Sequence, residues 1–257
     1  MSSPARDWIA ALRNSHERLV SLTKPLTTEQ LTGRSYDSEW TVAQVLSHLG
    51  SGAEIAQLTL AAAVGGTGVG QDAYQLIWDT WNAKNPQEQA EDCLAANEAH
   101  ISRLEQLTDP ELDAIHYQFF GMDQDAAGLV RLRLSEHALH TWDVAVALDP
   151  AAQVAPDAVA LLISYVPTMA RFAGGPAGEQ FRLRLRGSGP AADFLLAVTE
   201  SVVMEPWREG TSAAEIVLPD EALLRLVYGR LDPGHTPAEV TGELADLDRV
   251  RAVFPGF

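Results

Sequence analysis

One stretch of the chain, LSEHALHTWD, combines the kinds of side chain that bind metals. Read as a helix, it places Glu136, His140 and Asp143 on one stripe, because residues three, four and seven apart lie above one another. Leu132 and Leu139 border this stripe, so we expect a carboxylate and an imidazole to point together into an apolar interior. Buried ionisable groups are costly unless they are paired or hold a metal. A Glu and a His on successive turns can supply half of a zinc site.

The best donor for the other half of such a site is His48. The residues before it predict a helix that starts with a capping box, in which Thr41 is the N-cap and Gln44 stands three residues later. The apolar face of that helix consists of Val42, Val45, Leu46 and Leu49. His48 lies within this face, so we predict a site formed by His48, Glu136 and His140 with one open position.

Each of these side chains also has a simpler interpretation. A lone histidine on an apolar helical face, such as His48, is more often a hydrogen-bonded core residue. Glu136 and His140 could form only a side-chain hydrogen bond on one helix. Asp143 could accept a hydrogen bond from an imidazole N–H or be a plain polar residue near the helix end. His137 points about a third of a turn away from the stripe, so we leave it out of the site. Spacing alone does not decide between these interpretations.

Four short motifs occur in order along nearly the whole chain. They are Trp40-Thr41-Val42 with His48, Glu136-x-x-x-His140-x-Trp142-Asp143, Gly229-Arg230, and the closing Phe254-Pro255-Gly256. As an ordered set they resemble the mycothiol-dependent maleylpyruvate isomerase family, whose N-terminal half belongs to the DinB-like metal-binding four-helix bundles. The resemblance implies that His48, Glu136 and His140 bind zinc and that mycothiol is a cofactor. It also implies that an arginine of the C-terminal domain reaches the site, and Arg230 is the position that matches best.

A length of 257 residues is long for a single core and predicts two domains. The resemblance implies that residues 1–150 form a DinB-like metal-binding helix bundle. Its predicted long helices are one that ends before Pro25, one at 42–63, one from Pro86 through Leu107, and one at 124–148.

Residues 151–257 mix strands with helices, which predicts an α+β domain similar to the sterol-carrier-like C-terminal domain of the same family. Strict alternation at 181–186 indicates a half-buried strand. Further strands are expected at 194–203, 215–218 and 239–244, with helices at 157–172 and 220–227. The expected fold class is therefore a two-domain chain, an N-terminal four-helix bundle followed by a C-terminal α+β domain.

Charge and hydropathy limit the possible partners. The formal net charge of −17 argues against nucleic acid, whose phosphates need a basic surface, and against an anionic membrane surface. No targeting segment and no apolar run long enough to span a bilayer is visible, so a cytoplasmic location is the default expectation. We expect small-molecule partners and a monomer or a homodimer.

Cys93 is the single cysteine, which excludes an internal disulfide, a cysteine zinc cluster and a Cys-x-x-Cys redox pair. It follows Glu91 and Asp92, acidic neighbours that are expected to raise its pKa. We interpret Cys93 as a small core residue. Any thiol chemistry would therefore use a low-molecular-weight thiol from outside the chain.

An open zinc site with two nitrogen ligands and one oxygen ligand suits thiol activation, because a thiol bound to zinc is deprotonated near neutral pH. The resemblance implies that mycothiol adds to maleylpyruvate, and that rotation and elimination then give the trans isomer, fumarylpyruvate. Arg230 would pair with a substrate carboxylate, or would act as a cation at a helix C-terminus. Three hypotheses remain: the isomerase, a mycothiol S-transferase acting on another electrophile in detoxification or biosynthesis, and a non-catalytic metal-binding or interaction protein.

Overall fold

The computed structural model describes residues 2–37, 39–65, 71–119, 122–209 and 213–256. The chain divides into two compact units, Met1–Val154 and Ala155–Phe257. Within the described ranges, no helix combines the length and the apolar character needed to cross a membrane.

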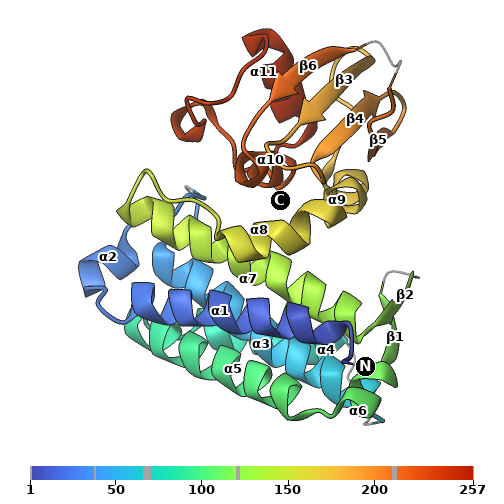
Figure 1. Cartoon of the computed structure of the whole chain (residues 1–257). Helices are drawn as coiled ribbons and strands as arrows, with labels where there is room; N and C mark the ends of the chain where they lie inside the picture. Colours follow the sequence, from blue (N-terminus) through green and yellow to red (C-terminus); the bar gives the residue numbers. More distant parts are fainter. Residues whose placement is uncertain (1, 38, 66–70, 120–121, 210–212, 257) are drawn as a thin grey trace. The chain divides into compact units, whose positions relative to one another are not determined.

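The first unit is built around a bundle of long helices, as predicted (Figure 1). They are α1 (Ala5–Thr23), α3 (Val42–Ala63), α5 (Pro86–Gln106) and α7 (Ala126–Leu148). The shorter elements are α2 (Thr28–Thr32), α4 (Gln71–Asn82), α6 (Asp109–Asp113), and an antiparallel hairpin of β1 (His116–Phe119) and β2 (Met122–Asp125). In the bundle α3 contacts α5 and α7, and α1 contacts the same two helices. The bundle therefore brings α3 and α7, the two helices with candidate ligands, together.

Capping explains where the helices begin. The Thr41 side chain accepts from the Gln44 N–H, and the Gln44 side chain accepts from the Thr41 N–H, which is the predicted capping box of α3. Asn85 and Glu88 form the same arrangement at the start of α5, where Pro86 occupies the first turn. Such a cap stabilises a helix by about 1 kcal/mol. The starts of both helices are therefore encoded locally.

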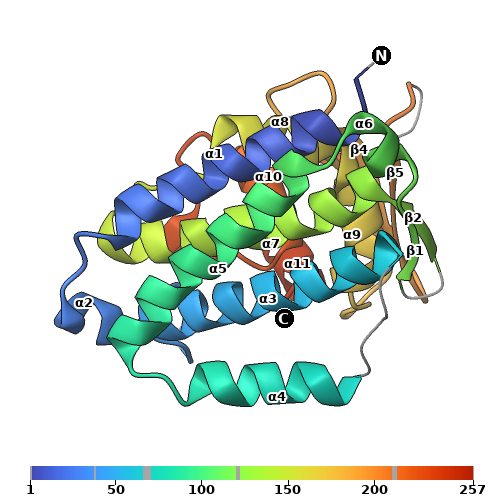
Figure 2. The same cartoon turned by 90° about the horizontal axis from the view of Figure 1, so that it is seen from below.

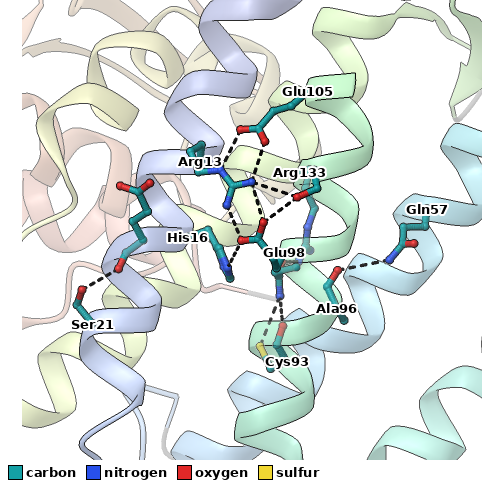
Figure 3. Close-up of polar contacts among 12 residues, drawn as sticks. Arg13, His16, Ser21, Gln57, Cys93, Ala96, Glu98, Glu105 and Arg133 are labelled. Atoms are coloured by element: carbon teal, nitrogen blue, oxygen red, sulfur yellow. Dashed lines mark hydrogen bonds and ion pairs between the residues drawn. The ribbon is translucent and has the colours of Figure 1, made fainter. Parts of the chain in front are cut away.

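Charged groups hold α1 against α5 (Figure 3). The guanidinium of Arg13 lies 2.5 Å from a Glu98 oxygen and 2.8 Å from a Glu105 oxygen. Hydrogen bonds from Arg13 and Ser102 lower the pKa of Glu98 to about 2. This network lies outside the apolar core and fixes the register of the two helices.

A buried arginine joins three helices inside the bundle. Arg133 of α7 donates from Nη2 to the carbonyl oxygen of Leu49 on α3 (2.7 Å) and to Oδ1 of Asn97 on α5 (2.6 Å). Gly52 leaves room for it, because a Cβ at this position would lie 2.9 Å from Nη1 of Arg133. The contact to Leu49 stands one residue after His48, so Arg133 anchors the helix segment that carries a candidate ligand.

Helix α4 lies beside α3, outside the ring of long helices (Figure 2). Trp81 near its end is fully buried, and its ring fits against Gly50 of α3, where a Cβ would overlap the indole. A glycine is therefore required for this close approach. The Gly50–Trp81 contact holds α4 against α3, the helix that carries His48.

The second unit combines a sheet with short helices. Its helical elements are α8 (Pro156–Leu162), η1 (Ile163–Tyr165), α9 (Val166–Ala173), α10 (Asp220–Val227), η2 (Pro233–His235) and α11 (Leu244–Val253). Its strands are β3 (Phe181–Arg186), β4 (Asp193–Val198), β5 (Val202–Pro206) and β6 (Ala214–Val217). The strand order is β5-β4-β3-β6, with β3 and β6 parallel and the other pairs antiparallel. The expected fold class, a helix bundle followed by an α+β domain, is confirmed.

Two strand predictions in this unit are wrong in detail. The single strand expected at 194–203 is a hairpin of β4 and β5, turned where the Thr199 N–H donates to the Ser201 carbonyl. The strand expected at 239–244 is reduced to one bridge between Val217 and Thr241. Gly242 follows with φ +133°, a backbone conformation that interrupts a strand.

Candidate metal centre

Three side chains from two helices converge in the first unit. His48 comes from α3, and Glu136 and His140 come from successive turns of α7. Nε2 of His48 lies 3.2 Å from Oε2 of Glu136, and Nε2 of His140 lies 3.6 Å from the same oxygen. One potential ligand atom from each residue lies within 4.8 Å of the others. Two imidazole nitrogens and a carboxylate oxygen form a donor set typical of catalytic zinc.

The three side chains are less buried than predicted. The side chain of Glu136 is 49% exposed and that of His48 is 36% exposed, whereas His140 is 13% exposed. The expectation that both helices bury these groups on apolar faces is therefore wrong for Glu136 and His48. A carboxylate inside a closed apolar core would cost several kcal/mol, which an open position avoids. The exposure also leaves a route for a further ligand.

The two imidazoles favour the ionised form of Glu136. Partial removal from water raises the pKa of this carboxyl, but the interactions with His140 and His48 outweigh that effect and hold the pKa well below its usual range. The carboxylate is thus surrounded by protein and still reachable from solvent. An ionised oxygen with two imidazoles beside it presents the charge that a divalent cation needs.

Asp143 orients the ring of His140. Its carboxylate is buried and lies 2.7 Å from Nδ1 of His140. Because an ionised carboxylate only accepts, Nδ1 carries a proton, and Nε2, on the side of Glu136, is the ring nitrogen that would bind a metal once it has lost its own proton. Metal-binding histidines are commonly held in this way. Of the two interpretations of Asp143, the geometry supports that of an acceptor for an imidazole N–H.

Trp40 packs over both imidazoles. Its ring stacks on that of His140 at a centroid distance of 6.4 Å and an angle of 20°, and lies 5.4 Å from the ring of His48. Trp40 immediately precedes the N-cap of α3, so the capping box also places this indole. The indole therefore stacks on the His140 ring and makes a tilted contact with the His48 ring.

His137 and Cys93 are core residues. The His137 ring is buried, and its Nδ1 lies 2.8 Å from the Ser15 hydroxyl. Burial raises the pKa of the Cys93 thiol to about 12. The predicted neutral thiol thus has a different cause, because the acidic neighbours Glu91 and Asp92 are exposed.

Arg230 lies just beyond the end of α10. Its Nη1 donates to the carbonyl oxygen of Tyr228 (2.9 Å), and its backbone N–H donates to the Arg225 carbonyl (2.7 Å). Gly229, which lies between Tyr228 and Arg230, has φ +71°, the left-handed conformation common after helices. These contacts support the interpretation of Arg230 as a cation at a helix C-terminus. Its role toward a substrate stays a prediction.

A cavity of about 470 Å³ opens beside His48. It is lined by Trp40, by Gln44, His48 and Ser51 of α3, by Gln75, Trp78 and Asn82 of α4, and by Gln89 of α5. The available signal in the sequence is the spacing of the α3 and α4 residues, since each set follows one helical stripe. Spacing does not reveal that the two stripes face each other.

The chain resembles known proteins both in sequence and in fold. Residues 12–145 match the family model described as the mycothiol maleylpyruvate isomerase N-terminal domain. The solved structures of a mycothiol-dependent maleylpyruvate isomerase and of its histidine-to-alanine mutant each resemble the chain with a TM-score of 0.67 at 15% identity, over 95% of this chain and 98% of theirs. At that identity the likeness shows a shared fold. No curated protein sequence matches significantly. Because the family match spans more than half of the residues, the chain belongs to the mycothiol maleylpyruvate isomerase family of enzymes.

Proposed function

We propose that the chain is a zinc- and mycothiol-dependent enzyme that isomerises a cis double bond, as its family name describes. The observation that carries this proposal is the convergence of His48, Glu136 and His140 at an accessible position in a chain of this family. A protein of this fold with a purely structural role does not require an ionised carboxylate flanked by two imidazoles.

The residues present fit a zinc ion. His48 and His140 would supply nitrogen ligands and Glu136 an oxygen ligand, and Asp143 holds the His140 ring in the tautomer that a ligand requires. When bound, zinc would supply a positive charge that favours the thiolate form of a thiol near neutral pH.

The thiol has to come from outside the chain. Cys93, the single cysteine, is buried and its raised pKa keeps it neutral. When bound, mycothiol would supply a thiolate that adds reversibly to one carbon of the cis double bond while the adjoining carbonyl group accepts the π electrons. The carbon–carbon bond could then rotate, and departure of the thiolate would restore the double bond as trans without consuming mycothiol.

The test is turnover of maleylpyruvate by purified protein with and without mycothiol. We expect conversion to fumarylpyruvate only when mycothiol is present, and we expect Cys93→Ser to keep nearly the activity of the unmodified chain. Undiminished turnover without any added thiol would refute the thiol mechanism.

In this mechanism Arg230 binds a carboxylate of the substrate through its planar fork of donors. Arg230→Lys keeps the charge but loses the fork, so turnover of a dicarboxylate should fall at least about tenfold. The zinc content and the melting temperature should stay nearly unchanged, because a cation near a helix end contributes less than about 1 kcal/mol.

Arg186→Lys is the matched control for this variant. Arg186 lies on β3 and pairs with Glu215 on the sheet, so its replacement should leave turnover unchanged. Turnover by Arg230→Lys at the unmodified rate would assign Arg230 to the helix end alone. It would also favour the alternative S-transferase, whose electrophile needs no carboxylate.

A further inference from the structure

The cavity beside His48 is lined without formal charge. None of the described residues that line it is Asp, Glu, Lys or Arg, although such residues make up 21% of a chain with a net charge of −17. Its volume of about 470 Å³ lies in the range of roughly 300–1,000 Å³ that is common for small-molecule sites. A charged ligand would find no partner of opposite charge among these side chains, so the cavity suits a neutral one.

The amides of the cavity are each engaged at one end only. Gln44 and Asn82 accept hydrogen bonds within the protein through their carbonyl oxygens, and no partner within the described ranges takes their NH₂ groups. Gln75 and Gln89 donate through their NH₂ groups, and no described residue donates to their carbonyl oxygens. The cavity therefore offers both donors and acceptors. A hydroxyl group donates and accepts at once, so several hydroxyls suit this mixture.

Two indoles complete the cavity. Trp40 lies at the side of the imidazoles, and Trp78 of α4 is 42% exposed although it is a large apolar side chain. Indole faces offer flat apolar surface next to polar groups. A saturated ring with hydroxyls at its edge and C–H groups on its faces matches such walls. His48 lines the cavity and is also one of the three candidate metal ligands, so a ligand in the cavity would extend to the metal centre.

We propose that this cavity binds the neutral, hydroxyl-rich part of the thiol cosubstrate and thereby selects a sugar-like thiol over a charged peptide thiol. The inference rests on the proposed function for the presence of a thiol. It adds the residues that recognise the rest of that molecule, chiefly Gln75 and Trp78 of α4. Helix α4, which lies outside the four long helices, thus acquires a specificity role.

Binding can be measured apart from turnover with S-methyl derivatives, whose sulfur cannot ionise. Titration calorimetry on the zinc-loaded protein should show S-methyl mycothiol binding at least about tenfold more tightly than S-methylglutathione. Trp78→Ala and Gln75→Leu should each weaken S-methyl mycothiol about tenfold, as truncation of a contact residue commonly does. Leu76→Ala is the matched control, because Leu76 is an exposed apolar residue of the same helix outside the cavity lining. This variant should bind S-methyl mycothiol as tightly as the unmodified chain does.

Equal affinity for the two derivatives, or unchanged affinity in Trp78→Ala, would overturn the inference. Mycothiol-dependent turnover together with either result would leave the proposed function standing and reject only the cavity assignment. Conversely, binding that depends on Trp78 in a protein without isomerase activity would support the cavity assignment and reject the proposed reaction.

Discussion

The double substitution His48→Ala/His140→Ala should remove the metal and almost all activity. The two imidazoles come from different helices and face one carboxylate oxygen, so their loss leaves Glu136 as a single ligand, too few to hold zinc. We expect about one zinc per chain in the unmodified protein and under about 0.1 in the variant after dialysis. Turnover should fall by at least about a thousandfold, since a metal supplies several kcal/mol of charge stabilisation. Elemental analysis and the isomerase assay measure the two effects.

Two further variants make this result specific. His116→Ala changes an exposed histidine of β1 and should keep both zinc and activity. Asp143→Asn keeps the three ligands but weakens the acceptor that holds His140, so zinc affinity should fall about 10–100-fold. Full zinc occupancy in the double variant would show that zinc binds at another site.

Acid should destabilise the helix bundle well before its carboxylates are protonated. His100 is fully buried, and its removal from water lowers its pKa to about 3. An unfolded histidine has a pKa of about 6.5, so the unfolded chain takes up the proton first as the pH falls. The contribution of His100 to stability is therefore full above about pH 6.5 and declines towards pH 3, by about 2–3 kcal/mol at pH 4.5. Burial also lowers the pKa of His16 on α1, which adds to the same trend.

Urea unfolding at several pH values, followed by tryptophan fluorescence in the presence of a chelator, measures this dependence without metal release. His100→Leu removes the titrating group, so its unfolding free energy should change less between pH 7 and 4.5 than that of the unmodified chain. His116→Leu, at an exposed position, should follow the unmodified chain. An identical pH slope in His100→Leu would mean that other groups control the acid transition.

The sequence predicts elements well where local chemistry sets their ends. The capping box at Thr41 predicts the start of α3, and the strict alternation at 181–186 predicts β3 at both ends. The hairpin of β4 and β5 was missed because its turn at Thr199–Ser201 contains neither glycine nor proline. The strand expected at 239–244 has suitable residues but only one bridge to β6, and pairing of that kind depends on the rest of the fold.

The sequence predicts which residues form the candidate site, but it does not predict how exposed they are or which cavity lies beside them. Helical spacing aligns Glu136 with His140, and the apolar helix face around His48 points to the third ligand, in agreement with the family resemblance. Their exposure depends on how α3 and α7 meet, which no periodicity records. The cavity depends further on α4, whose position follows from the fit of Trp81 against Gly50. Contacts between segments distant in the sequence thus decide what the site can admit.

Arg133 and Gly52 carry a consequence for how this sequence can diverge. Because the guanidinium occupies the space where a side chain at position 52 would begin, each residue restricts the other. A side chain at position 52 would force the guanidinium to shift, so relatives that keep the arginine are expected to favour glycine there, whereas loss of the arginine would open position 52 to alanine or serine. Positions 52 and 133 should therefore vary together in an alignment of relatives. Arg133 also binds the Leu49 carbonyl beside His48. A change at this pair of positions would therefore alter the packing next to the metal centre while all three ligand residues stay the same.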